Sequence, residues 1–251
     1  MTEGPTARVH ALRIEKQFKG EILRDLFIKS KKLYIDPSLL IGRILSGATS
    51  FGKNILLYFD EYAIRIHLMM YGSIRFEREY SKPFSRVRLT LFFPEINLVV
   101  YNAPIVELDT REELWIRLSK DYGVDPLTNW DEEKLLTLIL ENKERKIGDL
   151  LLDQRVFNGI GNILRNEILF RSQVNPEKRV GELELEDIKR IMMYTKSLSY
   201  KFLEFKVLGR GIKPVLLVYN RKFCPRCKNK LVFYRQESNK RKTFYCPNCQ
   251  H

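Results

Sequence analysis

The chain has 251 residues, of which 44% are hydrophobic and 12% aromatic, so it can bury either one large core or two modest ones. Lysine and arginine total 44 against 31 aspartates and glutamates, and the formal net charge of +13 favours an anionic partner, with nucleic acid the first candidate. No apolar run approaches the roughly 18 residues of a membrane span, and no signal peptide is seen, so we expect a soluble intracellular protein with no membrane partner.

A helix is predicted at the start of the chain. Glu3 to Pro5 suit its first turn, because a proline there loses no intrahelical hydrogen bond. Four apolar residues then recur at helical spacing on one face, namely Ala7, Ala11, Ile14 and Phe18. Gly20 ends the pattern, so this helix should pack its apolar face against a core.

After this glycine, and as far as about residue 107, the hydrophobic period changes to two, which is typical of half-buried strands. The residues that share a face in this pattern are Tyr62, Ile64, Ile66 and Leu68 in one strand, and Val87, Leu89, Leu91 and Phe93 in another. Asp60-Glu61 falls at a hairpin turn. Several such strands in succession predict an antiparallel sandwich or barrel-like sheet, and a helical segment follows over residues 111–120.

The second half of the chain is predicted to be largely helical. Residues 123–126 form the domain boundary, and helical patterns follow over residues 130–142 and from Ile147. A long helix then carries six residues on one face, namely Ile188, Ile191, Met192, Thr195, Leu198 and Phe202. Gly209 ends this helix. We therefore predict three segments, residues 1–122, 123–209 and 210–251.

The central stretch Asn158-Gly159-Ile160-Gly161-Asn162 predicts a short turn between two helices. One helical pattern ends near Gln154, and Gly159 suits the left-handed backbone of a helix C-terminus. Gly161 permits a tight turn that ends at Asn162, a good N-cap residue. Backbone N–H groups at the start of the second helix can then bind an anion such as a phosphate, although an ordinary helical corner would show the same pattern.

All four cysteines lie after residue 223, in the pairs Cys224-x-x-Cys227 and Cys246-x-x-Cys249 with eighteen residues between them. This spacing favours a metal over disulfides, because each pair chelates one ion and two pairs complete a tetrahedral thiolate site. We therefore predict one structural Zn²⁺, with the residues between the pairs forming a two-stranded hairpin. A finger this small needs the metal in order to fold.

Three stretches together resemble the formamidopyrimidine-DNA glycosylase / endonuclease VIII family. They are Thr2-Glu3-Gly4-Pro5, residues 150–170 (LLLDQRVFNGIGNILRNEILF), and the cysteine region with Arg241. The resemblance implies an α+β, two-domain fold: an N-terminal antiparallel β-sandwich flanked by helices, then a helix–two-turn–helix bundle with a β-hairpin zinc finger. It also implies a base-excision DNA glycosylase with AP-lyase activity. Residues 157–169 look closer to the endonuclease VIII-like branch, which mainly removes oxidised pyrimidines.

The resemblance implies that the nucleophile is the α-amine of residue 2, exposed when the initiator methionine is removed. Such an amine has a pKa of about 8, so a useful fraction is neutral and can form a Schiff base. Here Thr2 replaces the usual proline, which leaves open a weaker lyase or a monofunctional glycosylase. Glu3 matches the acid/base at the sugar, and its position also suits the helix dipole. Lys53 matches a lysine that contacts the lesion's backbone, and is otherwise an ordinary exposed lysine.

Damaged DNA, double- or single-stranded, is the implied partner, and the protein is expected to be a monomer. Met70 matches the wedge that fills the gap when a base leaves the stack, and Tyr71 can share that role. Asn162 and Arg241 match phosphate contacts, and Lys146 is a further candidate. The arginine and phenylalanine with which many members fill the rest of the gap are missing from residues 100–106 of the sequence.

Two other classes of function stay open. A DNA-binding protein that has lost catalysis would explain Thr2 and the missing gap-filling pair, but it would not need Glu3. A zinc-ribbon adaptor on an unrelated domain would leave the match at the start of the chain unexplained. The implied location is the cytoplasm and nucleoid, or the nucleus, according to the organism.

Overall fold

The computed structural model describes residues 3–251, and the chain divides into two compact units. The first contains Thr6–Lys120, and the second contains Glu3–Pro5 together with Asp121–His251. The division falls inside the first helix, α1 (Gly4–Phe18), whose first two residues belong to the second unit. The mixture of helices with largely antiparallel sheets confirms the predicted α+β class.

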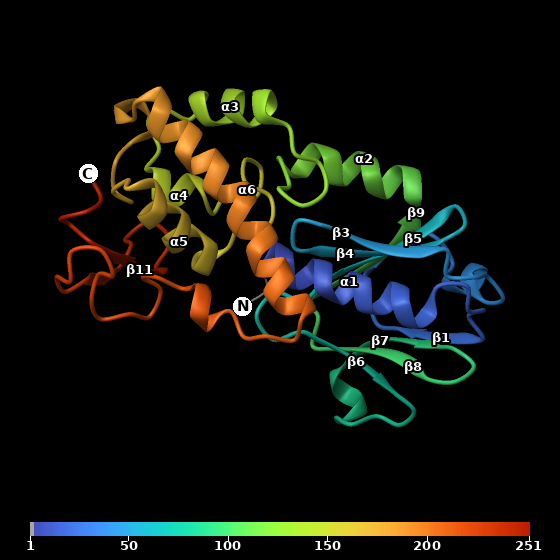
Figure 1. The fold of residues 1–251 in the computed structure, drawn as a ribbon. Helices are drawn as coiled ribbons and strands as arrows, with labels where there is room; N and C mark the ends of the chain where they lie inside the picture. The colour runs from blue at the N-terminus through green and yellow to red at the C-terminus, as the bar shows by residue number, and fades with distance from the viewer. Residues whose placement is uncertain (1–2) are drawn as a thin grey trace. The chain divides into compact units, whose positions relative to one another are not determined.

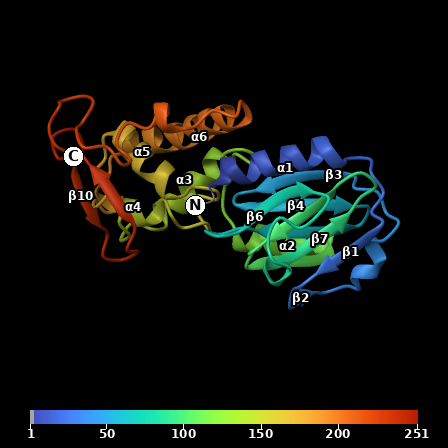
Figure 2. The same cartoon turned by 90° about the horizontal axis from the view of Figure 1, so that it is seen from below.

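Two sheets form the first unit (Figures 1 and 2). The four-stranded sheet has the order β1 (Asp25–Ile28), β7 (Val87–Phe92), β8 (Asn97–Tyr101) and β6 (Ser73–Glu77), and all its pairs are antiparallel. The five-stranded sheet has the order β2 (Lys32–Leu33), β9 (Ile105–Thr110), β5 (Tyr62–His67), β4 (Asn54–Phe59) and β3 (Gly47–Phe51). The hairpin turn predicted at Asp60-Glu61 is confirmed, because it joins β4 to β5.

The predicted antiparallel pairing has one exception in the described residues, at an edge, where β2 pairs with β9 in parallel. Hydrophobic alternation reports which face a side chain occupies, but it carries no information on strand direction. A parallel pair needs a long connection, and here β3 to β8 all lie between the two strands in the chain. The five-stranded sheet is therefore mixed.

The residues of α1 that face the first unit bury one hydrophobic core with both sheets. The four residues predicted on one face of the helix, Ala7, Ala11, Ile14 and Phe18, are at most 1% exposed, which confirms that prediction. They belong to the same cluster as Ile64 and Ile66 of β5 and Leu89 of β7. Each large apolar side chain buried in this way stabilises the fold by roughly 1.5–3 kcal/mol, which is why the helix is held on the sheets.

Strand β5 is more deeply buried than its alternation predicts. Arg65, expected on a half-exposed face, is 8% exposed and donates to Glu107 Oε2 of β9 at 2.9 Å. Arg117 of α2 (Arg111–Asp121) donates to the other oxygen, Glu107 Oε1, at 2.9 Å. The polar residues of this face can be buried because they pair with one another and with α2.

A β-bulge overturns the alternation predicted for β7. The register with β8 shifts between Val87, which pairs with Tyr101, and Leu89, which pairs with Val100. Leu89 packs in the main core, whereas Val87 packs with Tyr101 in a separate cluster. The prediction that Val87 and Leu89 share a face is therefore wrong, and Arg88 is the additional residue between them.

In the second unit, α3 (Glu132–Leu140), α4 (Ile147–Leu150), α5 (Asn162–Ser172) and α6 (Leu185–Val207) surround one core. All six residues predicted on one face of α6 are buried, which confirms that prediction. Strands β10 (Val232–Arg235) and β11 (Lys242–Tyr245) form the predicted antiparallel hairpin. Short 3₁₀ helices occupy Pro37–Leu40, Phe84–Arg86, Val180–Glu182 and Lys213–Val215. Within residues 3–251, no helix combines the length and the apolar character that crossing a membrane requires.

Candidate active site and metal centre

A buried carboxylate occupies the N-terminus of α5. Glu3 is 2% exposed, its Oε2 accepts a hydrogen bond from Gly161 N–H (3.0 Å), and its Oε1 accepts one from Ile163 N–H (2.8 Å). The first N–H groups of a helix have no partner inside the helix, and the helix dipole adds positive charge there. The anion bound by this turn is therefore the chain's own Glu3, and the N–H groups of Gly161 and Ile163 are already occupied by its carboxylate.

Glycine at position 161 is required by that carboxylate. Gly161, and not Asn162, is the N-cap residue of α5, so the predicted N-cap is wrong. The backbone of Gly161 is extended (φ −118°, ψ −168°), so its conformation alone does not demand glycine. A Cβ there would lie 2.6 Å from Glu3 Oε1, which leaves no room for a side chain. A residue far away in the sequence supplies the capping oxygens, so a local cap was not needed.

The backbone next to Glu3 is held by the same turn. Gly159 has the predicted left-handed backbone (φ 93°), but it does not close a helix, because α4 already ends at Leu150. Its carbonyl oxygen accepts from Gly4 N–H at 2.8 Å, and a Cβ on Gly4 would lie 3.1 Å from Gly159 Cα. Glu3 is thus fixed through its side chain and through the backbone of the following residue.

A cation in the last turn of α6 acts electrostatically on this carboxylate. Burial lowers the pKa of the half-buried Lys206, while the negative charge of Glu3 acts in the opposite direction. Sequence reasoning missed Lys206, because nothing local distinguishes it from the other basic residues of a chain with 44 of them. Its charge makes the surroundings of Glu3 more favourable to an anion.

Asn162 lies against the hairpin and is only 2% exposed. Its amide donates to the carbonyl oxygen of Lys242 at 2.9 Å, so the structure brings it beside the residue that follows Arg241. Arg241 is half-buried, and its backbone N–H donates to Asn239 Oδ1 at 2.7 Å in the turn of the hairpin. The two predicted phosphate contacts are therefore neighbours, and the bond to Lys242 uses one of the two N–H donors of the Asn162 amide.

Arg165 fastens the hairpin to α5. Its fully buried guanidinium donates to Gln236 Oε1 (2.6 Å) and to Thr243 Oγ1 (2.6 Å), one residue on each side of the hairpin turn. Burial lowers the pKa of Arg165 to about 10, which still leaves the group charged at neutral pH. The sequence gives no sign of this role, because Gln236 and Thr243 are more than 70 residues away from Arg165 in the chain.

Lys53 lies in the turn between β3 and β4, directly after Gly52, whose φ is 58°. Lys53 is half-buried, and its positive charge acts on the imidazole of His67 at the end of β5. Burial of His67, together with the charges of Arg65 and Lys53, lowers the pKa of His67 to about 4. His67 is therefore neutral at neutral pH, and its Nδ1 accepts from Met69 N–H at 3.2 Å.

The turn between β5 and β6 presents large side chains to the surface. Met69 is 48% exposed, Met70 is 53% exposed and Tyr71 is 78% exposed. The prediction that Met70 lies on an exposed tip is confirmed. Met69 has φ 47°, so the turn has a defined and unusual backbone for a non-glycine residue. Exposed apolar side chains on such a turn are suited to insertion between bases.

Strand registers gather these turns at one end of the first unit. His67 pairs with Asn54 and with Ile105, so the β3–β4 turn and the start of β9 lie at the end of β5. Tyr101 pairs with Ser73, which brings the β8–β9 turn beside the β5–β6 turn. The predicted contacts in the β3–β4 and β5–β6 turns therefore share one end of the unit.

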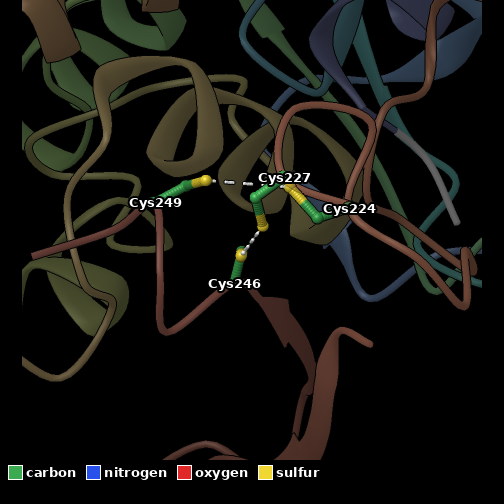
Figure 3. A group of neighbouring side chains, drawn as sticks. All are labelled: Cys224, Cys227, Cys246 and Cys249. Carbon is green, nitrogen blue, oxygen red and sulfur yellow. Dashed lines mark hydrogen bonds between the residues drawn. The ribbon is translucent and has the colours of Figure 1, made fainter. Parts of the chain in front are cut away.

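The four cysteines converge on one point (Figure 3). All four Sγ atoms lie within 4.8 Å of one another, with Cys227 Sγ 3.4 Å from Cys246 Sγ and Cys224 Sγ 3.9 Å from Cys249 Sγ. Four sulfurs at about 2.3 Å from one tetrahedral ion would be about 3.8 Å apart, so the set fits a single metal ion. The cysteines pack with Phe170, Leu231 and Phe244 in a small separate core.

Two family models match the chain: the formamidopyrimidine-DNA glycosylase N-terminal domain over residues 1–104, and the formamidopyrimidine-DNA glycosylase H2TH domain over residues 122–210. The probable endonuclease 8 2 of Streptomyces coelicolor is 31% identical, with 100% of this chain and 94% of the relative covered. The endonuclease 8-like 3 of Homo sapiens is 32% identical, with 85% of this chain and 36% of the relative covered. The chain thus spans about a third of the length of that relative.

Solved structures support the fold. The complex between wild-type Lactococcus lactis Fpg (MutM) and a DNA containing N7-benzyl-Fapy-dG matches with a TM-score of 0.87 and 21% sequence identity, over 99% of each chain. At this level of identity the likeness establishes the fold alone.

Proposed function

The chain belongs to the formamidopyrimidine-DNA glycosylase and endonuclease VIII family, and from this premise we propose that it is a DNA glycosylase of base-excision repair. Its substrates are oxidised bases, chiefly pyrimidines, in damaged double- or single-stranded DNA. An AP-lyase step through a Schiff base on the α-amine of residue 2 then cleaves the strand. The observation that carries the proposal is the buried Glu3 carboxylate, fixed by two backbone N–H groups and next to that amine in the chain.

The chemistry needs one amine and one carboxylate. The amine attacks the anomeric carbon of the sugar, the bond to the base breaks, and the base leaves with the electron pair and takes up a proton. The sugar ring opens as the nitrogen forms the imine, which makes the C2′ proton acidic. Loss of that proton expels the 3′ phosphate by β-elimination. Glu3 suits the proton transfers at the sugar, because a fixed and buried carboxylate needs no reorganisation during the reaction.

Thr2 lies outside the described residues, so its role rests on its place in the sequence. A threonine α-amine is primary and forms an imine as a proline amine does, but substitution of the usual proline changes its nucleophilicity. This departure favours a second candidate: a monofunctional glycosylase, or a homologue with weakened or lost catalysis that binds damaged DNA. The two candidates differ in whether a covalent imine forms.

The DNA contacts are proposed to come from both units. Lys53 and Arg241 contact phosphates of the damaged strand, and the exposed Met70 enters the gap left by the flipped base. Lys146 contributes less, because it is paired with Glu177 Oε2 at 2.6 Å. The net charge of +13 predicts affinity that falls steeply with salt. We place this activity in a monomer, in the compartment that holds the DNA.

We propose that the four cysteines bind one Zn²⁺, with Cys224, Cys227, Cys246 and Cys249 as thiolate ligands. Zinc with four sulfur ligands has no open position, so its part is structural: it fixes the strands of the hairpin that carries Arg241. Metal analysis of the purified protein is expected to give one zinc per chain. A value near zero in a folded, DNA-binding protein would contradict this assignment.

Borohydride trapping tests the proposed function. Wild type is incubated with duplexes that carry an abasic site or an oxidised pyrimidine, beside Thr2→Pro, Glu3→Gln and a control at the exposed Glu141, Glu141→Gln. We expect a covalent adduct with both substrates for wild type and for the control. Glu3→Gln should lose the adduct with the oxidised base.

Each other outcome selects an alternative. Base release without an adduct identifies a monofunctional glycosylase. An adduct from Thr2→Pro but not from wild type shows an intact scaffold with a weakened nucleophile. Binding with neither base release nor an adduct identifies a damaged-DNA-binding homologue. Mass spectrometry of the mature terminus accompanies these assays, because a retained methionine or an acetyl group blocks the amine.

A further inference from the structure

A cavity of about 580 Å³ opens between α3 and α6 of the second unit, which lie side by side (Figure 1). Its apolar lining consists of Trp130, Met192, Met193 and Tyr200. None of the residues to which we assign a DNA contact or a catalytic role lines it. The cavity is therefore a feature that the proposed function does not explain.

The apolar lining has the composition of a protein-binding surface. Met193 is 51% exposed and Tyr200 is 49% exposed, whereas Met192 belongs to the core of the unit and the half-buried Trp130 packs against that core. Aromatic residues and methionine are enriched at protein interfaces, and the flexible thioether of methionine adapts to the shape of a partner. The cavity thus offers a firm base and two exposed side chains to an incoming apolar group.

The charged lining of the cavity is mainly positive. Lys189 and Lys196 of α6 line it, against one carboxylate, that of Glu132. Lys196 Nζ lies 5.4 Å from the centre of the Trp130 ring, a cation–π contact, and no acidic residue lies three or four positions away from Lys196 in α6. Glu132 Oε1 already accepts a hydrogen bond from Trp130 Nε1 at 2.9 Å. The cavity therefore presents ammonium groups beside an apolar surface, which an acidic ligand with an apolar side chain would complement.

A nucleic-acid strand does not fit this surface. Asp131, Glu132 and Glu133 follow one another at the start of α3, and Glu132 lines the cavity. A strand carries a negative charge on every phosphate, so it would meet these carboxylates as it crossed the cavity. The ammonium of Lys196 also lies over the Trp130 ring, on which a base would otherwise stack. A peptide, whose acidic residues are few and separately placed, can approach α6 and avoid α3.

We propose that this cavity is the docking site of a partner protein, which contributes a short acidic segment with one large apolar side chain. The apolar side chain packs against Trp130 and Tyr200, and a flanking carboxylate pairs with Lys196. Burial of the apolar side chain supplies most of the affinity, and the charge pair determines which segments are accepted. The pair lies beside apolar surface, so water screens it less than it screens a pair on an open surface. A partner bound here holds the protein without using any proposed DNA contact.

Selection from random peptides displayed on phage tests the proposal, because it assumes nothing about the sequence of the partner. The immobilised proteins are full-length wild type, Lys196→Glu, Tyr200→Ala and a control, Lys201→Glu. Lys201 is a matched control because it is exposed on α6 and does not line the cavity, and its substitution changes the net charge by the same amount. Affinities of the enriched peptides are measured by fluorescence in a Trp115→Phe background, which leaves Trp130 as the only tryptophan. Thermal unfolding of each variant shows that the fold is kept.

We expect the enriched peptides to share a large apolar residue flanked by aspartate or glutamate, and to change the fluorescence of Trp130. Lys196→Glu and Tyr200→Ala should each weaken their binding at least about tenfold, because each removes one part of the recognition. Lys201→Glu should leave it within about twofold, because a charge pair on an open surface contributes little. Peptides with lysine in place of the acidic residues should bind Lys196→Glu more tightly than wild type, because the exchange restores opposite charges.

Three results would overturn the inference. No enrichment beyond that on Tyr200→Ala, or peptides that bind wild type and both cavity variants equally, would show that the cavity is not a docking site. Displacement of the peptides by a single-stranded oligonucleotide, with a larger loss of DNA affinity in Lys196→Glu than in Lys201→Glu, would assign the cavity to DNA. Self-association in sedimentation equilibrium that Lys196→Glu abolishes would make the occupant a second copy of this chain.

Discussion

The N-terminus of α5 and the cavity between α3 and α6 both gather positive charge, but only the first receives an anion from the chain. At α5, the N–H groups of Gly161 and Ile163 donate to the Glu3 carboxylate. In the cavity, the ammonium of Lys196 lies over the ring of Trp130, and α6 offers it no carboxylate one turn away. The difference separates two tasks: a reacting group has to be fixed before substrate arrives, whereas a recognition group keeps its charge for the ligand.

Removal of the metal should have the largest effect, because the hairpin that Arg165 binds to α5 depends on the metal. Chelation, or Cys246→Ser, is expected to unfold the hairpin, which breaks the bonds from Arg165 to Gln236 and Thr243. DNA affinity should fall at least about 100-fold, since structural zinc sites contribute on the order of 10 kcal/mol to folding. The measurement is anisotropy binding alongside zinc content, with zinc added back as the control. Full affinity in zinc-free protein would show that the hairpin folds without the metal.

Glu3→Gln should have the next largest effect, because it removes the charge that the α5 donors hold. The amide keeps one acceptor for the two N–H groups and presents an NH₂ to the other, at a cost of about 1–3 kcal/mol in stability. Base release should fall about 10²- to 10⁴-fold, as expected when a positioned acid/base is lost. Single-turnover excision rates and urea denaturation measure the two effects. An excision rate equal to that of Glu141→Gln would remove Glu3 from the chemistry.

Gly161→Ala should displace the carboxylate without removing it. The added Cβ would lie 2.6 Å from Glu3 Oε1, so the acid must move by about an ångström. We expect excision to fall by about 10- to 100-fold, because a misplacement of that size is costly in catalysis, while DNA affinity stays within about threefold. Gly211→Ala is the matched control, since a Cβ at Gly211 meets nothing within 4 Å. Comparable rates for the two variants would show that the position of the carboxylate is not critical.

These variants also mark the boundary of what the sequence could predict. The apolar faces of α1 and α6 and the cysteine cluster followed from spacing alone, because helical periodicity and chelation are local properties. The capping of α5 by Glu3 could not be predicted locally, because the two groups are 158 residues apart in the chain. For the same reason the sequence predicted Gly161 only as a turn residue. The structure needs glycine at this position because a side chain would collide with the Glu3 carboxylate.

The first unit shows the same limit in its strands. Alternation placed Val87 and Leu89 on one face, but the bulge at Arg88 puts them on two. A bulge is decided by the pairing of two strands, so one strand's sequence does not reveal it.

The smallest effect we predict is a pH dependence of stability that arises from His67, at the end of β5. The folded-state pKa of His67 is lowered to about 4 by burial and by the charges of Arg65 and Lys53, so the unfolded chain binds the proton first as pH falls. The stability contributed by neutral His67 is fully present above the unfolded pKa of about 6.5 and is lost as pH falls towards 4, by up to about 3 kcal/mol. Urea denaturation between pH 7 and pH 4 should show this loss in wild type and not in His67→Asn.

Binding of DNA should weaken this pH dependence of the free energy of unfolding. A phosphate bound by Lys53 would offset one of the two cations that lower the pKa of His67, so the pKa should rise in the complex. Titration of the imidazole by NMR, with and without a duplex carrying an abasic analogue, measures the change. Arg78→Met serves as the charge control, because it removes one exposed cation and leaves Lys53 in place. An unchanged His67 pKa in the complex would mean that no phosphate reaches Lys53.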